Sequence, residues 1–165
     1  MGDSGRVVNV LCVGLGGQGV LLASEILARA ALLAGLEVKK SEVHGMSQRG
    51  GGVTSHVRFG PAVFSPLIPM GQSDYILALS SEEGEKYRPY LKEGGAFLML
   101  PGKVVGRLSS PRMANVAACG LLSRSLSLPE DAWEKAVRES VPPGTEGANW
   151  DAFLAGEAVG VEDKR

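Results

Sequence analysis

The stretch of sequence that decides the fold is VVNVLCVGLGGQGVLLASEILARAALLA, residues 7–34. Its first part, Val7 to Val13, is an almost continuous apolar run, which predicts a strand buried on both faces. A glycine-rich turn, Gly14 to Gly19, comes next. The Ala- and Leu-rich run from Val20 to Ala34 predicts a helix that Gly35 ends as a C-cap. A strand, a tight turn and a helix in this order indicate the first unit of an α/β sheet.

The predicted helix is unusually apolar. Its only charged residues, Glu25 and Arg29, are spaced to form an (i, i+4) pair. With 15 residues it is too short to span a bilayer. Because it has little polar surface to face solvent, we expect one side to pack on the sheet and the other on a second helix or another subunit.

More strands are predicted after this unit. Leu36 to Glu42 is the second strand, and Val53 to Phe59 alternates between two faces. One face carries Val53, Ser55, Val57 and Phe59, and the other carries Thr54, His56 and Arg58. Gly60-Pro61 predicts a turn into Ala62 to Ser65, so that these two runs form a hairpin.

The remaining elements complete the pattern. Asp74 to Ser80 and Gly95 to Leu100 are apolar strand candidates, and Ser81 to Lys92 between them predicts a weak or broken helix. The last third predicts helices from Ser110 to about Leu126 and from Pro129 to about Val141, then a short turn around Trp150 and Phe153. We therefore predict one domain over residues 1–165. Its fold is α/β and Rossmann-like, with three layers, a mixed, mainly parallel sheet and a helical C-terminal end.

Composition excludes several classes of protein. Apolar residues make up 44% and charged residues 21%, which argues against a disordered chain or a coiled coil. The formal net charge of −1 argues against a surface dominated by nucleic-acid binding. The polar start, Met1 to Gly5, lacks the pattern of a signal peptide, so we expect a cytoplasmic protein with neither nucleic-acid nor membrane partners.

The two cysteines, Cys12 and Cys119, stand far apart in apolar surroundings. We expect two buried free thiols. The sequence has no CxxC motif or Cys/His cluster, so this chain alone offers no ligand set for a metal or an iron–sulfur cluster.

The glycine turn fits the pattern G-x-G-x-x-G between a strand and a helix. Its glycines allow a tight turn, and the free N–H groups of the helix start can face an anion. The candidate binding residues are Gly14, Gly16, Gly17, Gln18 and Gly19. Glu42, 23 residues past Gly19, lies near where a dinucleotide-binding protein places its ribose-binding acid. A free-standing NAD(P)-binding Rossmann protein is therefore an alternative, and glycines that only pack the helix on the strand are another.

A second glycine-rich segment, His44 to Gly52, has no hydrophobic period and predicts a loop at the carboxyl edge of the sheet. Its candidate binding residues are Gln48, Arg49, Gly50 and Gly51. Arg49 could bind a phosphate or a carboxylate, although a flexible surface loop would have the same composition. His56 is expected on a polar strand face. We find no nucleophile–base pair or paired carboxylates, so we predict no catalytic residue in this chain.

Several motifs together resemble a known family. They are Gly14-x-Gly16-Gly17-Gln18-Gly19, Ser41-Glu42-Val43-His44-Gly45-Met46-Ser47-Gln48-Arg49-Gly50-Gly51, Ser55-His56-Val57-Arg58 and Phe64-Ser65-Pro66-Leu67-Ile68. They resemble the gamma-type domain of the 2-oxoacid:ferredoxin oxidoreductases, and most closely the small (beta) subunit of the indolepyruvate-specific type. Asn115, in an apolar helix, is a further point of resemblance, and the similarity extends over nearly the whole chain.

The resemblance implies a non-autonomous subunit of a thiamine-diphosphate enzyme. Such complexes decarboxylate a 2-oxoacid such as indolepyruvate or another aryl pyruvate, transfer the acyl group to coenzyme A and pass electrons to ferredoxin. Thiamine diphosphate and the [4Fe-4S] clusters are expected on a large alpha subunit, and coenzyme A is the co-substrate. The two glycine-rich loops are then candidates for the coenzyme A side of the site. In isolation, the chain could form a homodimer through its apolar helix.

Overall fold

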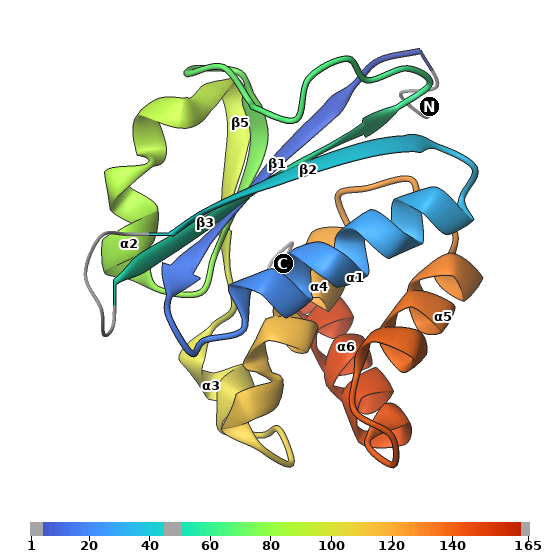
Figure 1. The fold of residues 1–165 in the computed structure, drawn as a ribbon. Coiled ribbons are helices and arrows are strands. Elements are labelled where there is room, and N and C mark those ends of the chain that lie inside the picture. Colours follow the sequence, from blue (N-terminus) through green and yellow to red (C-terminus); the bar gives the residue numbers. More distant parts are fainter. Residues whose placement is uncertain (1–4, 45–50, 163–165) are drawn as a thin grey trace.

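Five strands form one sheet with β1 (Val8–Leu15) in its middle (Figure 1). The computed structural model describes residues 5–44 and 51–162. Across the sheet, the order is β2 (Glu37–His44), β3 (Gly52–Gly60), β1, β4 (Ser73–Ala78) and β5 (Leu91–Met99). Every residue of β1 from Val8 to Gly14 is buried, which confirms the strand predicted from the apolar run.

The sheet is mixed, but less parallel than predicted. β4 pairs in parallel with both β1 and β5, whereas β3 runs antiparallel to both β1 and β2. Parallel neighbours need a long crossover connection, and residues 45–51 between β2 and β3 are too few for one. β3 therefore turns back and inserts between β2 and β1. The expectation of a mainly parallel sheet was wrong for this half of the sheet.

The predicted hairpin between β3 and Ala62–Ser65 was also wrong. Both edges of β3 are already occupied, by β1 and by β2. The segment 61–72 forms no strand, and it contains three prolines, Pro61, Pro66 and Pro69, which have no N–H to donate to a ladder. It crosses the polar face of β3 instead.

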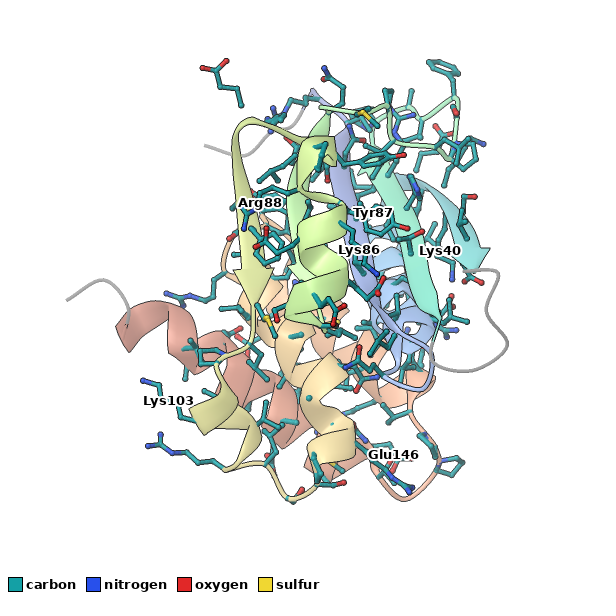
Figure 2. The ribbon with its side chains drawn as sticks, turned by 90° about the vertical axis from the view of Figure 1, so that its left-hand side faces the viewer. Lys40, Lys86, Tyr87, Arg88, Lys103 and Glu146 are labelled. Atoms are coloured by element: carbon teal, nitrogen blue, oxygen red, sulfur yellow. The ribbon has the colours of Figure 1, made fainter. Side chains whose placement is uncertain are left out.

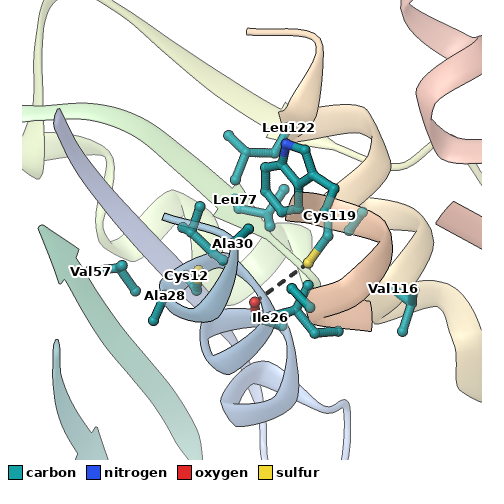
Figure 3. Packing of buried hydrophobic residues seen from close by; sticks show 14 of the residues in the cluster. Cys12, Ile26, Ala28, Ala30, Val57, Leu77, Val116, Cys119 and Leu122 are labelled. Carbon is teal, nitrogen blue, oxygen red and sulfur yellow. Dashed lines mark hydrogen bonds between the residues drawn. The ribbon is translucent and has the colours of Figure 1, made fainter. Parts of the chain in front are cut away.

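One face of the sheet is covered by α1 (Val20–Leu33) and α4 (Ala114–Ser123), with α5 (Glu130–Ser140) and α6 (Glu146–Glu162) packed behind them (Figure 1). Cys12, Ile26 and Cys119 meet in this core, where the Cys119 thiol lies 3.4 Å from the Ala23 carbonyl oxygen (Figure 3). Both cysteines are free and buried, as predicted.

The other face is covered by α2 (Ser81–Lys86), the 3-10 turn Arg88–Tyr90 and the segment 61–72. Figure 2 shows α2 in front of the sheet, with Lys86, Tyr87 and Arg88 labelled. Leu11 and Val13 of β1 pack on this side, so β1 contributes to both layers of core.

Local predictions around α1 were confirmed. The helix ends at Leu33, and Gly35 takes a positive φ of 84° just beyond the C-cap. Arg29 and Glu25 form the expected pair, at 3.2 Å between Nη2 and Oε1. The predicted weak helix after β4 is indeed broken into α2 and the turn that follows it.

The C-terminal end is more helical than predicted. A short helix α3 (Gly102–Val105) and a 3-10 turn, Pro111–Met113, precede α4, which ends at Ser123 rather than near Leu126. α6 has 17 residues where a short turn was expected. It packs so closely on α4 that a Cβ on Gly156 would overlap the backbone of Ala117. Glycine lowers the helix propensity of this segment, but it permits the close packing of the two helices. Among the described residues, no helix is both long and apolar enough to cross a membrane.

Candidate functional site

The glycine turn joins the carboxyl end of β1 to the start of α1, at the lower edge of the sheet in Figure 1. Gly17 and Gly19 have φ values of +88° and +82°, a region that L side chains rarely adopt. Gly19 is the N-cap of α1. The N–H groups of the first turn, from Val20 to Leu22, have no partner within the helix. The turn therefore presents backbone donors and the positive end of a helix dipole.

Gln18 shapes this turn with its side chain. Its Oε1 accepts a hydrogen bond from the Leu15 amide at 2.7 Å, and its Nε2 donates to the Leu79 carbonyl at 3.2 Å. The side chain thus ties the turn to itself and to the end of β4. Among the predicted binding residues, Gln18 is placed to position the loop.

The other glycines have different roles in the structure. A Cβ on Gly14 would lie 2.8 Å from Cγ2 of Val20 and 3.1 Å from Cβ of Leu79, so Gly14 allows α1 to pack close to the strand. Gly16 donates its N–H to the Gly51 carbonyl at 3.0 Å, which joins the two predicted loops. Gly17 and Gly19 both line a cleft. A Cβ on Gly17 would meet open space, whereas a Cβ on Gly19 would meet the side chain of Asn115.

The cleft has a volume of ≈ 770 Å³, within the usual range for ligand sites. Its facing wall comes from the end of β5, α3, the 3-10 turn Pro111–Met113 and the start of α4, and it includes Met99, Leu100, Val105, Arg112 and Asn115. Among the described residues that line the cleft, none is acidic and Arg112 is the one with a cationic side chain. The cleft therefore combines backbone donors, one exposed guanidinium and an apolar wall, which suits an elongated ligand with an anionic group.

Asn115 links the two walls. It is buried at the start of α4, and its Nδ2 donates to the Gly19 carbonyl at 3.2 Å. Neither Asn115 nor Arg112 was among the candidate site residues from the sequence. The signal for Asn115 was a polar residue in an otherwise apolar helix; for Arg112, which is exposed, no sequence signal pointed to the cleft.

Of the four candidate binding residues in the second predicted loop, only Gly51 lies among the described residues, where its carbonyl accepts the hydrogen bond from Gly16 of the first loop. The predicted binding residues Gln48, Arg49 and Gly50 lie outside the described residues. Next to Gly51, Gly52 lies close to the buried carboxylate of Glu83. Oε1 of this carboxylate is 2.7 Å from Nζ of Lys86.

His56 is not part of the cleft. Its side chain is buried, and its Nδ1 accepts a hydrogen bond from the Ile68 amide at 3.0 Å. Burial lowers the pKa of His56 below its usual 6.5. The two thiols are not suited to act as nucleophiles, because a thiol reacts as its thiolate. Burial raises the pKa of Cys12 to about 12 and that of Cys119 well above its usual value.

Glu42 does not occupy the place of a ribose-binding acid. It lies on β2, which is separated from β1 by the inserted strand β3, and its carboxylate is 3.1 Å from Lys40 Nζ. Two strand spacings, about 9–10 Å, therefore separate β2 from the strand that leads into the glycine turn. This arrangement does not support the dinucleotide-binding alternative.

Known proteins of one enzyme family match this chain in sequence. A family model described as pyruvate ferredoxin/flavodoxin oxidoreductase matches residues 9–104. The chain is 34% identical to the indolepyruvate oxidoreductase subunit IorB of Thermococcus kodakarensis, over 93% of this chain and 96% of that protein.

Solved structures share the fold. The gamma subunit of a keto/oxoacid ferredoxin oxidoreductase from Geobacter sulfurreducens has a TM-score of 0.76 and 30% identity, covering 90% of this chain and 95% of that chain. The 2-oxoglutarate:ferredoxin oxidoreductase from Magnetococcus marinus, solved with 2-oxoglutarate, coenzyme A and succinyl-CoA, has a TM-score of 0.80 at 22% identity. There the match covers 93% of this chain but 31% of the other, so the same fold is part of a longer polypeptide.

Proposed function

The chain belongs to the pyruvate ferredoxin/flavodoxin oxidoreductase family, and we propose that it acts as the small subunit of a cytoplasmic 2-oxoacid:ferredoxin oxidoreductase. The reaction is oxidative decarboxylation of a 2-oxoacid to an acyl-CoA, with transfer of the electrons to ferredoxin. We infer indolepyruvate or another aryl pyruvate as the substrate class. The observation that carries this proposal is the 34% identity with an indolepyruvate oxidoreductase subunit, over nearly the full length of both chains.

This chain is not suited to hold the redox centres. Among the described residues, no group of three or more His, Cys, Asp or Glu side chains could hold a metal ion. Both thiols are buried in the apolar core, and burial raises the pKa of each above its usual value. An iron–sulfur cluster is typically held by four Cys thiolates, whereas this chain has two cysteines, both in its apolar core. In the proposed complex, the clusters and thiamine diphosphate belong to a large alpha subunit.

The contribution of this chain is to bind and orient coenzyme A. The anionic groups of coenzyme A suit the amides of Gly17, Gly19 and the first turn of α1. The guanidinium of Arg112 lies in the same cleft and adds a charge-assisted donor. Met99, Leu100 and Val105 offer an apolar wall for the uncharged arm of the ligand. Gln18 and Asn115 hold the loop in place, and the predicted role of Arg49 stays a proposal.

Reconstitution tests this proposal. The purified chain alone is expected to show no 2-oxoacid oxidoreductase activity, and activity should appear when a large, iron- and thiamine-containing chain is added. The assay measures coenzyme A-dependent reduction of ferredoxin with indolepyruvate, phenylpyruvate, 2-oxoglutarate and pyruvate. Activity from this chain alone, or a reconstituted enzyme that ignores coenzyme A, would contradict the proposal. A preference for pyruvate or 2-oxoglutarate would contradict only the substrate class.

A further inference from the structure

The segment 61–72, here called the strap, is unusual for an exposed segment. Its sequence, PAVFSPLIPMGQ, has no charged residue. It leaves three large apolar side chains in solvent: Phe64 is 93% exposed, Leu67 52% and Met70 67%. Soluble proteins seldom gather such side chains without a use for them.

The strap is held firmly by side chains of the strands beneath it. Arg58 donates from Nη1 to the Ser65 carbonyl at 2.8 Å, and from Nε to Oδ1 of Asn9 at 2.9 Å. His56 accepts from the Ile68 amide, as described above. Asn9 donates to the Gln72 carbonyl at 2.9 Å, which fixes the far end.

Two apolar anchors complete this fixation. Val63 is 1% exposed and Ile68 is 3% exposed, so the strap alternates between side chains buried in the protein and side chains offered to solvent. The polar face of β3 predicted from the sequence is thus the base on which the strap rests. A segment that is already ordered loses little conformational entropy when a partner binds it.

An apolar hollow adjoins the first residue of the strap, on the side of the sheet opposite the strap's exposed side chains. This hollow of ≈ 290 Å³ opens next to Pro61, and its walls include Phe59, Leu36, Leu126 and Leu128. Exposed apolar side chains, one of them aromatic, on a segment without charge match the core of a stable protein–protein interface. The strap lies at the end of the sheet opposite the glycine turn, so a partner bound there leaves the cleft accessible (Figure 1).

We propose that the strap is the docking surface for the large, cofactor-bearing chain of the complex. This inference rests on the proposed function, in which the redox centres lie on another chain. Two findings favour that occupant over a second copy of this chain. The similar protein from Thermococcus kodakarensis is itself described as a subunit, and in the Magnetococcus marinus enzyme the same fold is continuous with a longer polypeptide.

The test compares binding of the purified large chain to variants of the full-length small chain. The variant Phe64→Ser/Met70→Ser removes the two most exposed apolar side chains, and Phe64→Leu/Met70→Leu keeps them apolar. Leu32→Ser is the matched control, because Leu32 is 58% exposed at the end of α1 and lies outside the strap. We expect the Ser variant to weaken binding by about 100-fold or more, while the Leu variant and the control stay within about threefold of wild type.

The outcomes separate the two proposals. If the wild type binds the large chain and the Ser variant binds equally well, the strap inference is overturned and the proposed function stands. If the wild type does not bind the large chain at all, the proposed function fails. Sedimentation of the isolated chain adds a third result: a wild-type dimer that the Ser variant dissociates, with unchanged binding of the large chain, assigns the strap to a second copy and overturns the inference. Unchanged thermal unfolding of each variant shows that the differences do not come from misfolding.

Discussion

At the carboxyl end of β1, the glycine turn offers backbone amides with almost no side chains, whereas at the opposite end of the sheet the strap offers side chains on a firmly held backbone. The first end is shaped by what is missing, since Gly17 and Gly19 need positive φ and Gly14 needs close packing. The second is shaped by what is present, since Arg58, His56 and Asn9 hold the strap. Backbone donors suit the anionic group of a ligand, and exposed apolar side chains suit a protein partner.

The largest effect is expected from placing a side chain in the glycine turn. Gly19→Ala should lower the free energy of unfolding by about 2–4 kcal/mol, because the new Cβ meets both an unfavourable φ and the amide of Asn115. The matched variant is Gly17→Ala, which has the same kind of φ but open space around it. It should lose about 1–2 kcal/mol, from backbone strain alone. Equal losses in urea unfolding would show that the contact with Asn115 does not matter.

The sequence was most informative where structure is local. The apolar run of β1, the glycine turn and the α1 helix with Gly35 could all be predicted, because each depends on residues within one turn or strand of its neighbours. The place of β3 could not, because the insertion between β2 and β1 depends on pairing between distant segments. The same holds for Asn115, whose partner Gly19 is 96 positions away.

The strap shows a second limit of sequence reasoning. The alternation of β3 correctly assigned Thr54, His56 and Arg58 to one face, which was expected to be polar. The structure covers it with segment 61–72, so that His56 is buried. A polar strand face can be exposed to solvent, or it can be covered by a segment whose backbone bonds to its polar side chains. The sequence pattern alone does not distinguish these two cases.

The second largest effect is expected at the strap. Arg58→Met keeps the aliphatic stem but removes the hydrogen bonds to Ser65 and Asn9, and should cost about 1.5–3 kcal/mol of unfolding free energy. Arg138→Met is the control, because Arg138 forms an exposed pair with Glu134 on α5 and should cost less than about 0.5 kcal/mol. Coenzyme A affinity of the reconstituted enzyme should be unchanged by Arg58→Met. A large loss of that affinity would show that the two ends of the sheet are coupled.

A smaller effect is expected at the cleft. Arg112→Ala removes an exposed cation from the cleft wall and should raise the KM for coenzyme A about 3- to 10-fold in the assembled enzyme, with little change in stability. Arg124→Ala is the control, because Arg124 is also exposed, at the C-cap of α4, but does not line the cleft. An increase in salt should reduce the difference between wild type and Arg112→Ala. An unchanged KM would remove Arg112 from the site.

The smallest effect is a pH dependence that belongs to the strap and not to the cleft. Because burial lowers the pKa of His56 below 6.5, the folded protein binds this proton less tightly than the unfolded chain does. The resulting stability is present above pH 6.5 and is lost as the pH falls below that value towards the folded pKa. Protonation also removes the acceptor for the Ile68 amide, so hydrogen exchange at that amide should speed up in acid. In His56→Gln this part of the pH dependence of unfolding should disappear. If wild type and variant lose stability in parallel between pH 7 and pH 5, carboxylates elsewhere cause the loss, and the strap is not the pH-sensitive end of the sheet.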